Sequence, residues 1–476
     1  MELLWIPRTP TAVAVGERPA RNLADELSID RQTFRDLEIF EAEGGGPGLF
    51  ELLNRTRTAG GARILQSRFR HPFSNATKIR GVQDSIRHIL ANRAIFNDLP
   101  SDGTISALEQ YLHCATSVLS TRNPVEFLIE ALEVRFGELQ EYMNVVRGVH
   151  RTAGMIAGLR RLTEQPALQD APGELGPWLQ EMRELLSRPA LGILPKEGEG
   201  ELASWRIMRM DRMLRMDERT TVERLMRLSF DIDALVSMAD VTQAFNYTMP
   251  EVCDEPGVFI GKGIYHPFLT EPVANPLHVD QQQRLLFITG PNMAGKTTYL
   301  RACGIAIYLA SLGMGVPATS LRFSPCNNLF SAIALTDNVR EGVSFFRAEA
   351  LRVKTIARAI ADGRNIVALL DEPFKGTNLK DALDASRIVL EHLARKQGSV
   401  FLVSSHLIEL GDSLAASGNV QCCRFEANES AGTLEFDYVL RPGISSQRLG
   451  VRVLREEGVF ALLDSDAAEG INVIAT

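Results

Sequence analysis

The chain has 476 residues, of which 45% are hydrophobic, and this predicts two or three domains with ample core. A net charge of −8 excludes a nucleic-acid partner attracted by bulk charge alone. The six cysteines lack metal-ligand spacing, the first ten residues lack a signal-like apolar segment, and no run of 18 uncharged apolar residues occurs. We therefore expect a reduced, cytoplasmic protein without structural zinc and without a membrane partner.

Three segments follow one another along the chain. Residues 1–30 mix prolines, arginines and acids without a period, and we interpret them as an extension or a small strand pair. Residues 31–240 are expected to form an all-α core, interrupted at Gly/Pro clusters such as 44–47 and 189–200. From 241 to 476, short apolar runs alternate with helix-like stretches, which predicts an α/β domain with a parallel sheet.

Individual strands and helices can be predicted within the α/β segment. We expect strands at 284–289, 329–335, 366–371 and 400–404, and helices at 296–312, 347–362 and 381–396. The strands are continuous apolar runs, as parallel strands covered on both faces should be. Ligands of such sheets bind at the carboxyl ends of the strands.

A phosphate-binding loop follows the first of these strands. Its residues, with the next threonine, are Gly290, Pro291, Asn292, Met293, Ala294, Gly295, Lys296, Thr297 and Thr298. Backbone N–H groups of such a loop surround phosphates, Lys296 would reach the β- and γ-oxygens, and Thr297 would ligate Mg²⁺. The alternative is a chance match, which the strand before the loop and the helix after it disfavour. The loop therefore predicts ATP and Mg²⁺ as ligands.

Polar residues also follow two later strands. Asp371 and Glu372 end the apolar run 366–370, and His406 follows the strand 400–404. We expect Asp371 to join the Mg²⁺ shell, Glu372 to orient the attacking water, and His406 to contact the γ-phosphate or that water. The alternatives are a helix-capping acid pair and a structural histidine.

Two further features of the sequence concern binding partners, namely a second subunit and DNA. Ser344, after Gly342, precedes an expected helix and predicts a second anion site for a phosphate from another subunit, although an ordinary serine cap is the alternative. Residues 54–97 contain nine basic residues and one acidic residue. This stretch either follows a nucleic-acid backbone or forms a solvated helix face. Its expected DNA contacts are Arg55, Arg57, Arg63, Arg68 and Arg70.

Together these motifs resemble the MutS family of DNA-repair ATPases. The resemblance rests on GPNMAGKTTYLR at 290–301, on Tyr265-His266-Pro267, on Ala274-Asn275-Pro276-Leu277, and on LNRTRTAGGARILQSRFRHPF at 53–73. It implies an ABC-like P-loop ATPase domain behind a helical core (lever) domain. It also implies a homodimer with composite ATP sites, in which Glu372 is the catalytic carboxylate, His406 the switch histidine and Ser344 the signature serine.

The sequence also departs from the family pattern. The stretch Asp371 to Asn378 reads DEPFKGTN where DEIGRGTS is usual, and no Gly-x-Phe-x-Glu mismatch-reading motif occurs. We expect a divergent, truncated member without the mismatch-recognition domain or the clamp. The expected function is ATP hydrolysis coupled to binding of distorted or branched DNA. The alternative is an ATP-gated scaffold that binds protein partners and not DNA.

Overall fold

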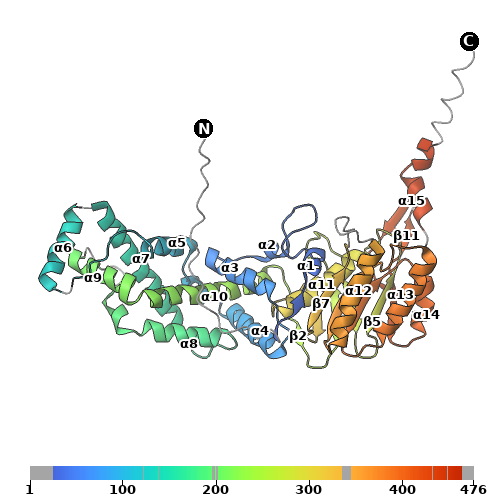
Figure 1. The fold of residues 1–476 in the computed structure, drawn as a ribbon, viewed down its shortest axis with the longest axis horizontal. Helices are drawn as coiled ribbons and strands as arrows, with labels where there is room; N and C mark the ends of the chain where they lie inside the picture. Colours follow the sequence, from blue (N-terminus) through green and yellow to red (C-terminus); the bar gives the residue numbers. More distant parts are fainter. Residues whose placement is uncertain are drawn as a thin grey trace, which may run out of the picture.

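The protein is elongated, with a helical arm at one end and a helix-covered sheet at the other (Figure 1). The computed structural model describes residues 25–463 except 122, 138, 196–198, 200–201, 335–344, 431–432 and 448. A helical N-terminal region followed by a mixed α/β region confirms the coarse architecture expected from the sequence. The arm contains α3 (Ala59–Arg70), α4 (Ala76–Ala91), α5 (Asp102–Leu112), α6 (Pro124–Gly137), α7 (Leu139–Thr163), α8 (Leu175–Leu186), α9 (Ser204–Arg212) and α10 (Arg219–Ala244).

The close approach of α3 and α10 explains why small residues begin α3. A Cβ atom on Gly61 would lie 2.1 Å from the Asp233 carboxylate, and one on Gly60 would lie 2.6 Å from the Phe230 ring. The buried Asp233 carboxylate accepts hydrogen bonds from the backbone N–H and the hydroxyl of Thr58, at 3.0 and 2.8 Å. Thr58 also caps α3 by accepting from the N–H of Gly61. The Thr-Ala-Gly-Gly sequence thus fixes the base of the arm.

The junction of α9 and α10 is a π-helical turn, Met213–Asp217. Arg215 lies in this turn and does not face solvent. Its guanidinium is buried and pairs with the Asp211 carboxylate at 2.6 Å, and the Tyr111 hydroxyl donates to the same carboxylate at 2.8 Å. A buried charge needs such a partner, so this arginine belongs to the arm interior.

The main sheet has seven strands in the order β1-β7-β8-β9-β5-β10-β13. All neighbouring pairs are parallel except β10 with β13. The strands are β1 (Ser28–Ile29), β7 (Asn328–Ala332), β8 (Ile366–Asp371), β9 (Val400–Ser404), β5 (Leu285–Thr289), β10 (Val420–Arg424) and β13 (Arg441–Pro442). The four strands expected from the sequence occupy the centre of this sheet, and β7 ends three residues earlier than predicted.

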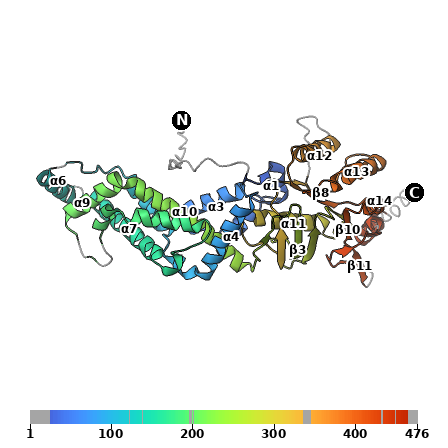
Figure 2. The same ribbon diagram turned by 90° about the horizontal axis from the view of Figure 1, so that it is seen from below.

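Helices cover both faces of the sheet (Figure 2). Alternate residues of each central strand face opposite cores: Leu286 and Ile288 pack with α11 (Lys296–Ser311), whereas Leu285 and Phe287 pack on the other side. That second side is covered by α12 (Phe345–Ala361), α13 (Leu379–Ala394) and α14 (Glu409–Ala415). Burial on both faces is the reason why these strands are apolar along most of their length.

Smaller elements surround this layer. A second sheet has four strands in the order β2-β6-β3-β4. Three of these strands precede α11 in the chain, and β6 follows it. Its strands are β2 (Glu251–Val252), β3 (Phe259–Ile264), β4 (Asn275–Val279) and β6 (Ser320–Phe323). The strands β11 (Ala427–Ser430) and β12 (Thr433–Phe436) form an antiparallel pair, and α15 (Gly450–Glu456) projects from the far end in Figure 1. No helix in the described residues is both long enough and apolar enough to cross a membrane.

The segment 25–36 joins the arm to the sheet. Its strand β1 adds to the edge of the main sheet beside β7, and α1 (Arg31–Asp36) follows directly. The backbone of the same segment bonds to the α3–α4 connection, through Leu27 N to Pro72 O and Ser74 N to Asp25 O. A short helix, α2 (Leu49–Leu53), then leads into α3. The sequence placed residues up to 30 in an extension or a small strand pair and the following residues in a helical core, and it did not predict that this segment joins the main sheet.

Candidate nucleotide site

The loop between β5 and α11 is a tight cradle that requires glycine at both ends. Gly290 has a φ of 150° and Gly295 a φ of 96°, values that favour glycine. A Cβ atom on Gly290 would lie 2.8 Å from the Phe425 carbonyl oxygen, and one on Gly295 would lie 3.2 Å from the Tyr438 ring. Between them, Met293 also has a positive φ, 67°, and its side chain is 72% exposed. The chain therefore turns sharply here, with its apolar side chain directed to solvent.

Lys296 begins α11 with its side chain folded into the loop. Its Nζ donates to the carbonyl oxygens of Gly290 and Pro291, both at 3.0 Å. Burial lowers the pKa of this amine, while the nearby carboxylates of Glu372 and Asp371 act in the opposite direction. The loop, the ammonium and the two carboxylates are thus one electrostatic unit at the strand ends.

Asp371 connects three neighbouring elements. The Thr297 hydroxyl donates to its Oδ2 at 2.7 Å, and the Ser404 hydroxyl donates to its Oδ1. Because β8, β9 and β5 are adjacent and parallel, their carboxyl ends bring Asp371, Ser404 and the loop together. A hydroxyl beside a carboxylate is the kind of all-oxygen donor set that Mg²⁺ prefers.

Glu372 and His406 are in direct contact, with 2.5 Å between Oε1 and Nε2. The hydrogen bond from His406 lowers the pKa of the Glu372 carboxyl, with smaller contributions from Lys296 and Lys375, although burial opposes them. The Glu372 N–H also donates to the Ser404 carbonyl at 2.9 Å, which continues the β8–β9 pairing by one residue. The sequence predicted both residues at the site and did not predict their direct contact.

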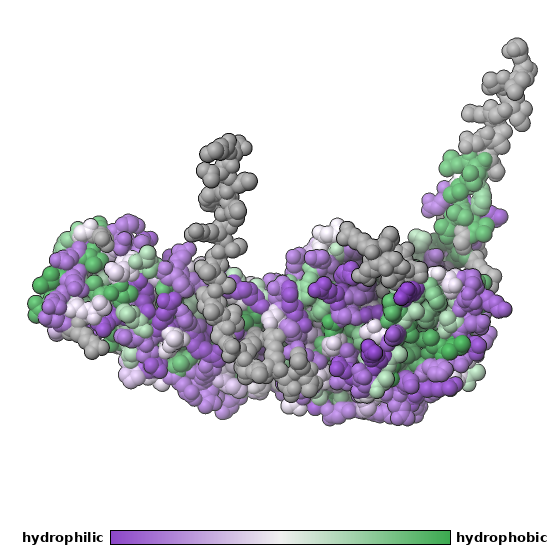
Figure 3. Space-filling view, in the orientation of Figure 1, coloured by the Kyte–Doolittle hydropathy of each residue, from purple (hydrophilic) through white to green (hydrophobic). Residues whose placement is uncertain are grey.

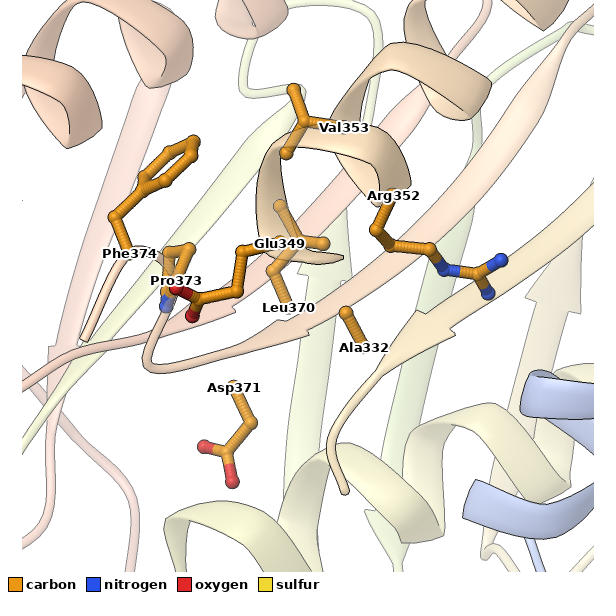
Figure 4. Close-up of a pocket in the computed structure, with 8 residues that line it drawn as sticks. All are labelled: Ala332, Glu349, Arg352, Val353, Leu370, Asp371, Pro373 and Phe374. Carbon is orange, nitrogen blue, oxygen red and sulfur yellow. The ribbon is translucent and has the colours of Figure 1, made fainter. Parts of the chain in front are cut away.

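Beyond Glu372 the chain turns back beneath α12 and lines a small hollow (Figure 4). Glu349 and Arg352 of α12 and Phe374 of the turn contribute to its wall. In this view the Asp371 carboxylate points away from Glu349, toward the opposite face of the sheet. The hollow therefore lies on the α12 side of the sheet, opposite the side that α11 covers.

Tyr438 is a candidate site residue that sequence reasoning missed. Its ring edge lies at Gly295, it stacks on Phe436 with 6.2 Å between ring centroids, and the residue is 45% exposed. The buried Asn275 side chain holds this segment by donating to the Tyr438 carbonyl at 2.9 Å and accepting from the Leu440 N–H at 2.7 Å. Asn275 was noted only as part of a resemblance motif, and nothing in the sequence links it to a tyrosine so far along the chain.

Two models of known protein families match the chain: residues 32–187 match MutS domain III, and residues 286–472 match MutS domain V. The chain belongs to the MutS family. In this MutS-family protein the loop 290–298, Asp371, Glu372 and His406 all lie within the domain V match. The domain III match includes most of α1, so it begins at the edge of the main sheet and extends into the arm.

Ser344, the expected signature serine, lies outside the described residues. Its chain neighbours Phe345 and Phe346 begin α12, close to the turn that follows Glu372: the Phe346 and Phe374 ring centroids are 6.0 Å apart. The helix that follows the expected serine in the chain therefore packs directly on the turn that follows the expected catalytic carboxylate.

The basic stretch of the domain III region is largely neutralised. Five of its nine basic side chains pair with carboxylates, four of which come from outside the stretch: Arg68–Glu174, Lys78–Asp25, Arg80–Asp254, Arg87–Asp84 and Arg93–Asp240. Among the expected DNA contacts, Arg68 is largely buried, whereas Arg63 and Arg70 are exposed. Arg55 lies over the Phe245 ring, and Arg57 donates to the Asn97 side chain. The local charge therefore overstates what is available to a phosphate backbone.

Proposed function

We propose that this MutS-family protein is an ATPase with an ABC-like P-loop domain, and that it couples ATP turnover to binding of distorted or branched DNA. The observation that carries the proposal is the convergence of three polar elements at neighbouring strand ends. Lys296 and Thr297 follow β5, Asp371 and Glu372 end β8, and His406 follows β9. Such a convergence at one sheet edge is the arrangement that phosphoryl transfer to water requires.

Each residue has a role that its contacts support. The Lys296 ammonium, now on two loop carbonyls, would move to the β- and γ-phosphate oxygens. The ionised Glu372 carboxylate would accept a hydrogen bond from the attacking water and orient it in line with the γ-phosphorus. His406 holds Glu372 in place and keeps it charged. Tyr438, at the rim of the loop, would stack on the adenine ring.

The residues present fit a magnesium ion. Thr297 Oγ1 and Asp371 Oδ2 are 2.7 Å apart, and both are hard oxygen donors. Bound there, Mg²⁺ would neutralise charge on the phosphate oxygens as a Lewis acid. Asp371 is held for this role by the Ser404 hydroxyl, which fixes its other oxygen.

The proposal includes a dimer with composite sites, in which Ser344 of one copy acts on the nucleotide of the other. Support comes from the family resemblance at Ser344 and from the packing of α12 on the turn after Glu372. Residues 31–240 would form the lever and residues 241–476 the ATPase domain. Segment 25–36 would link them, because it bonds to both. Sedimentation with and without a nonhydrolysable ATP analogue tests the dimer, which should form or tighten with the nucleotide.

The experiment on the ATPase itself uses two variants. Glu372→Ala should bind ATP with parental affinity and lose turnover, whereas Lys296→Ala should lose tight binding. Orienting a water by a carboxylate is worth about 10²–10⁴ in rate. Hydrolysis by Glu372→Ala at the parental rate would remove Glu372 from the mechanism.

A second function, an ATP-gated scaffold for a protein partner, is favoured by the tip of the arm. The exposed side of α6 and the start of α7 is apolar, visible at the left end of Figure 3. Its members are Val125, Leu128, Ile129, Leu132, Phe136, Leu139 and Met143. Contiguous exposed apolar surface of this kind marks protein contacts, and it would not attract DNA.

Salt separates the two functions. Binding through phosphate contacts weakens steeply as salt rises, because counterions are released. Gel-shift titrations on duplex, mismatched and branched DNA at several salt concentrations should therefore show a steep slope if DNA is the partner. Negligible binding to all three would favour the scaffold.

A further inference from the structure

The turn that carries Glu372 has a strained backbone. Glu372 and Phe374 both have positive φ, 51° and 65°, although neither is glycine. Non-glycine residues occupy this region only when their surroundings impose it, and such residues cluster at functional sites. The strain places the Glu372 side chain where it meets His406, so whatever holds the turn also sets the position of the carboxylate.

The holding group is the carboxylate of Glu349, which approaches from α12. Glu349 is only 5% exposed, and its Oε2 accepts a hydrogen bond from the N–H of Gly376 at 3.3 Å. The backbone N–H groups of Lys375 and Phe374 are near enough to lower the pKa of the same carboxyl. A single buried carboxylate thus faces successive N–H groups of the strained turn. Burial raises the pKa of Glu349, and the nearby backbone N–H groups and Lys375 oppose the rise.

Packing of α12 on the turn is equally close. A Cβ atom on Gly376 would lie 2.6 Å from the Phe345 ring and 2.8 Å from the Phe346 nitrogen, so only glycine fits. The Lys375 ammonium lies over the Phe345 ring, 5.6 Å from its centroid. The first turn of α12 and the turn after Glu372 therefore form one packed unit.

The helix α12 is itself fixed to the sheet three residues after Glu349. The Arg352 guanidinium donates to the Ser331 carbonyl at 2.8 Å through Nε, to the Thr33 hydroxyl at 3.0 Å, and to the Asp30 carboxylate. Glu349 thus acts from a helix that is anchored to β7 and to the segment before and within α1.

We propose that Glu349 is a positioning residue for the ATPase reaction: it holds the strained 372–376 turn so that the Glu372 carboxylate faces the γ-phosphate. This inference rests on the proposed function. It assigns Glu349 no contact with ATP and no part in nucleotide affinity.

The test compares variants that disturb the contact from its two sides. Glu349→Gln replaces an acceptor oxygen by an NH₂ group that faces backbone donors, and Gly376→Ala pushes α12 away from the turn. Lys354→Gln, which removes an exposed charge from the same helix, is the matched control. For each variant, kcat is measured at saturating ATP, affinity by calorimetry with ADP, and folding by the thermal midpoint.

Misplacing a catalytic group by about 1 Å lowers rates by up to about 100-fold. We expect kcat to fall by at least about 10-fold in Glu349→Gln and in Gly376→Ala, with ADP affinity within about twofold of the parent and no change in Lys354→Gln. Glu349→Asp, which keeps the charge and shortens the reach, should recover part of the loss. A purely structural role would lower the thermal midpoint and affinity together, and would not give this separation.

Parental kcat in both Glu349→Gln and Gly376→Ala would overturn the inference and leave the ATPase proposal intact. Loss of ADP affinity in proportion to kcat would also overturn it, because Glu349 would then support binding. If one of the two variants does not fold, the other gives the same answer. A parental protein that does not hydrolyse ATP would refute the proposed function and this inference with it.

Discussion

The docking of α1 on the main sheet depends on Asp36, and its removal should cost substantial stability. The carboxylate is 1% exposed and accepts four hydrogen bonds: from the Gln32 side chain, the Ser331 hydroxyl and the N–H groups of Ile333 and Ala334. Two of these donors, on Ser331 and Ile333, are themselves buried. In Asp36→Ala each would lose its acceptor, at a cost of about 1–3 kcal/mol apiece. We expect a loss of about 4 kcal/mol in the free energy of unfolding.

Urea unfolding followed by circular dichroism measures this loss. The control is Asp84→Ala, which removes a half-exposed carboxylate paired with Arg87 in the next helical turn. Exposed pairs of this kind contribute less than about 1 kcal/mol. A loss for Asp36→Ala no larger than that of the control would refute the argument that segment 25–36 is locked to β7.

Three further predictions concern the nucleotide site. Gly290→Ala should weaken ATP binding by about tenfold or more, because a clash and strain of about 1–3 kcal/mol distort the loop. The control is Gly363→Ala, which is also at positive φ but has nothing within 4 Å of the added Cβ; it should leave ATP binding unchanged. Tyr438→Ala should weaken ATP binding by about tenfold, since base stacking is worth about 1–3 kcal/mol, and should leave the affinity for inorganic triphosphate unchanged. Tyr438→Phe should bind ATP as the parent does. The lowered pKa of Glu372 means that its ionised carboxylate stabilises the fold above the ordinary pKa value of 4.5 and loses that effect as pH falls through the folded value. The advantage of the parent over Glu372→Gln in thermal midpoint should therefore shrink as pH falls below about 4.5; an advantage that grows on acidification would contradict the assignment.

The central strands and the loop were predictable because their signals are local. Residues 366–370 and 400–403 are buried on both faces and all apolar, and the glycines at 290 and 295 sit where φ requires them. The convergence of Asp371 with Thr297 then follows from parallel topology alone.

The remaining features depend on contacts between distant residues. Strand β1 has only two residues, too few for a period, and it exists because β7 offers an open edge. The basic stretch was overestimated because acids such as Glu174 and Asp240 reach it only in the folded chain. Tyr438 and Glu349 carry no local motif, and their importance appears only when the loop and the 372–376 turn are placed beside them.

The most direct test of the account is calorimetric titration of the purified protein with ATP and Mg²⁺, alongside Lys296→Ala. The account predicts saturable binding to the parent, a rise in its thermal midpoint with nucleotide, and loss of both in the variant. A well-folded parent that gives no binding heat and no shift in midpoint would contradict the central claim that the 290–297 loop holds a nucleoside triphosphate.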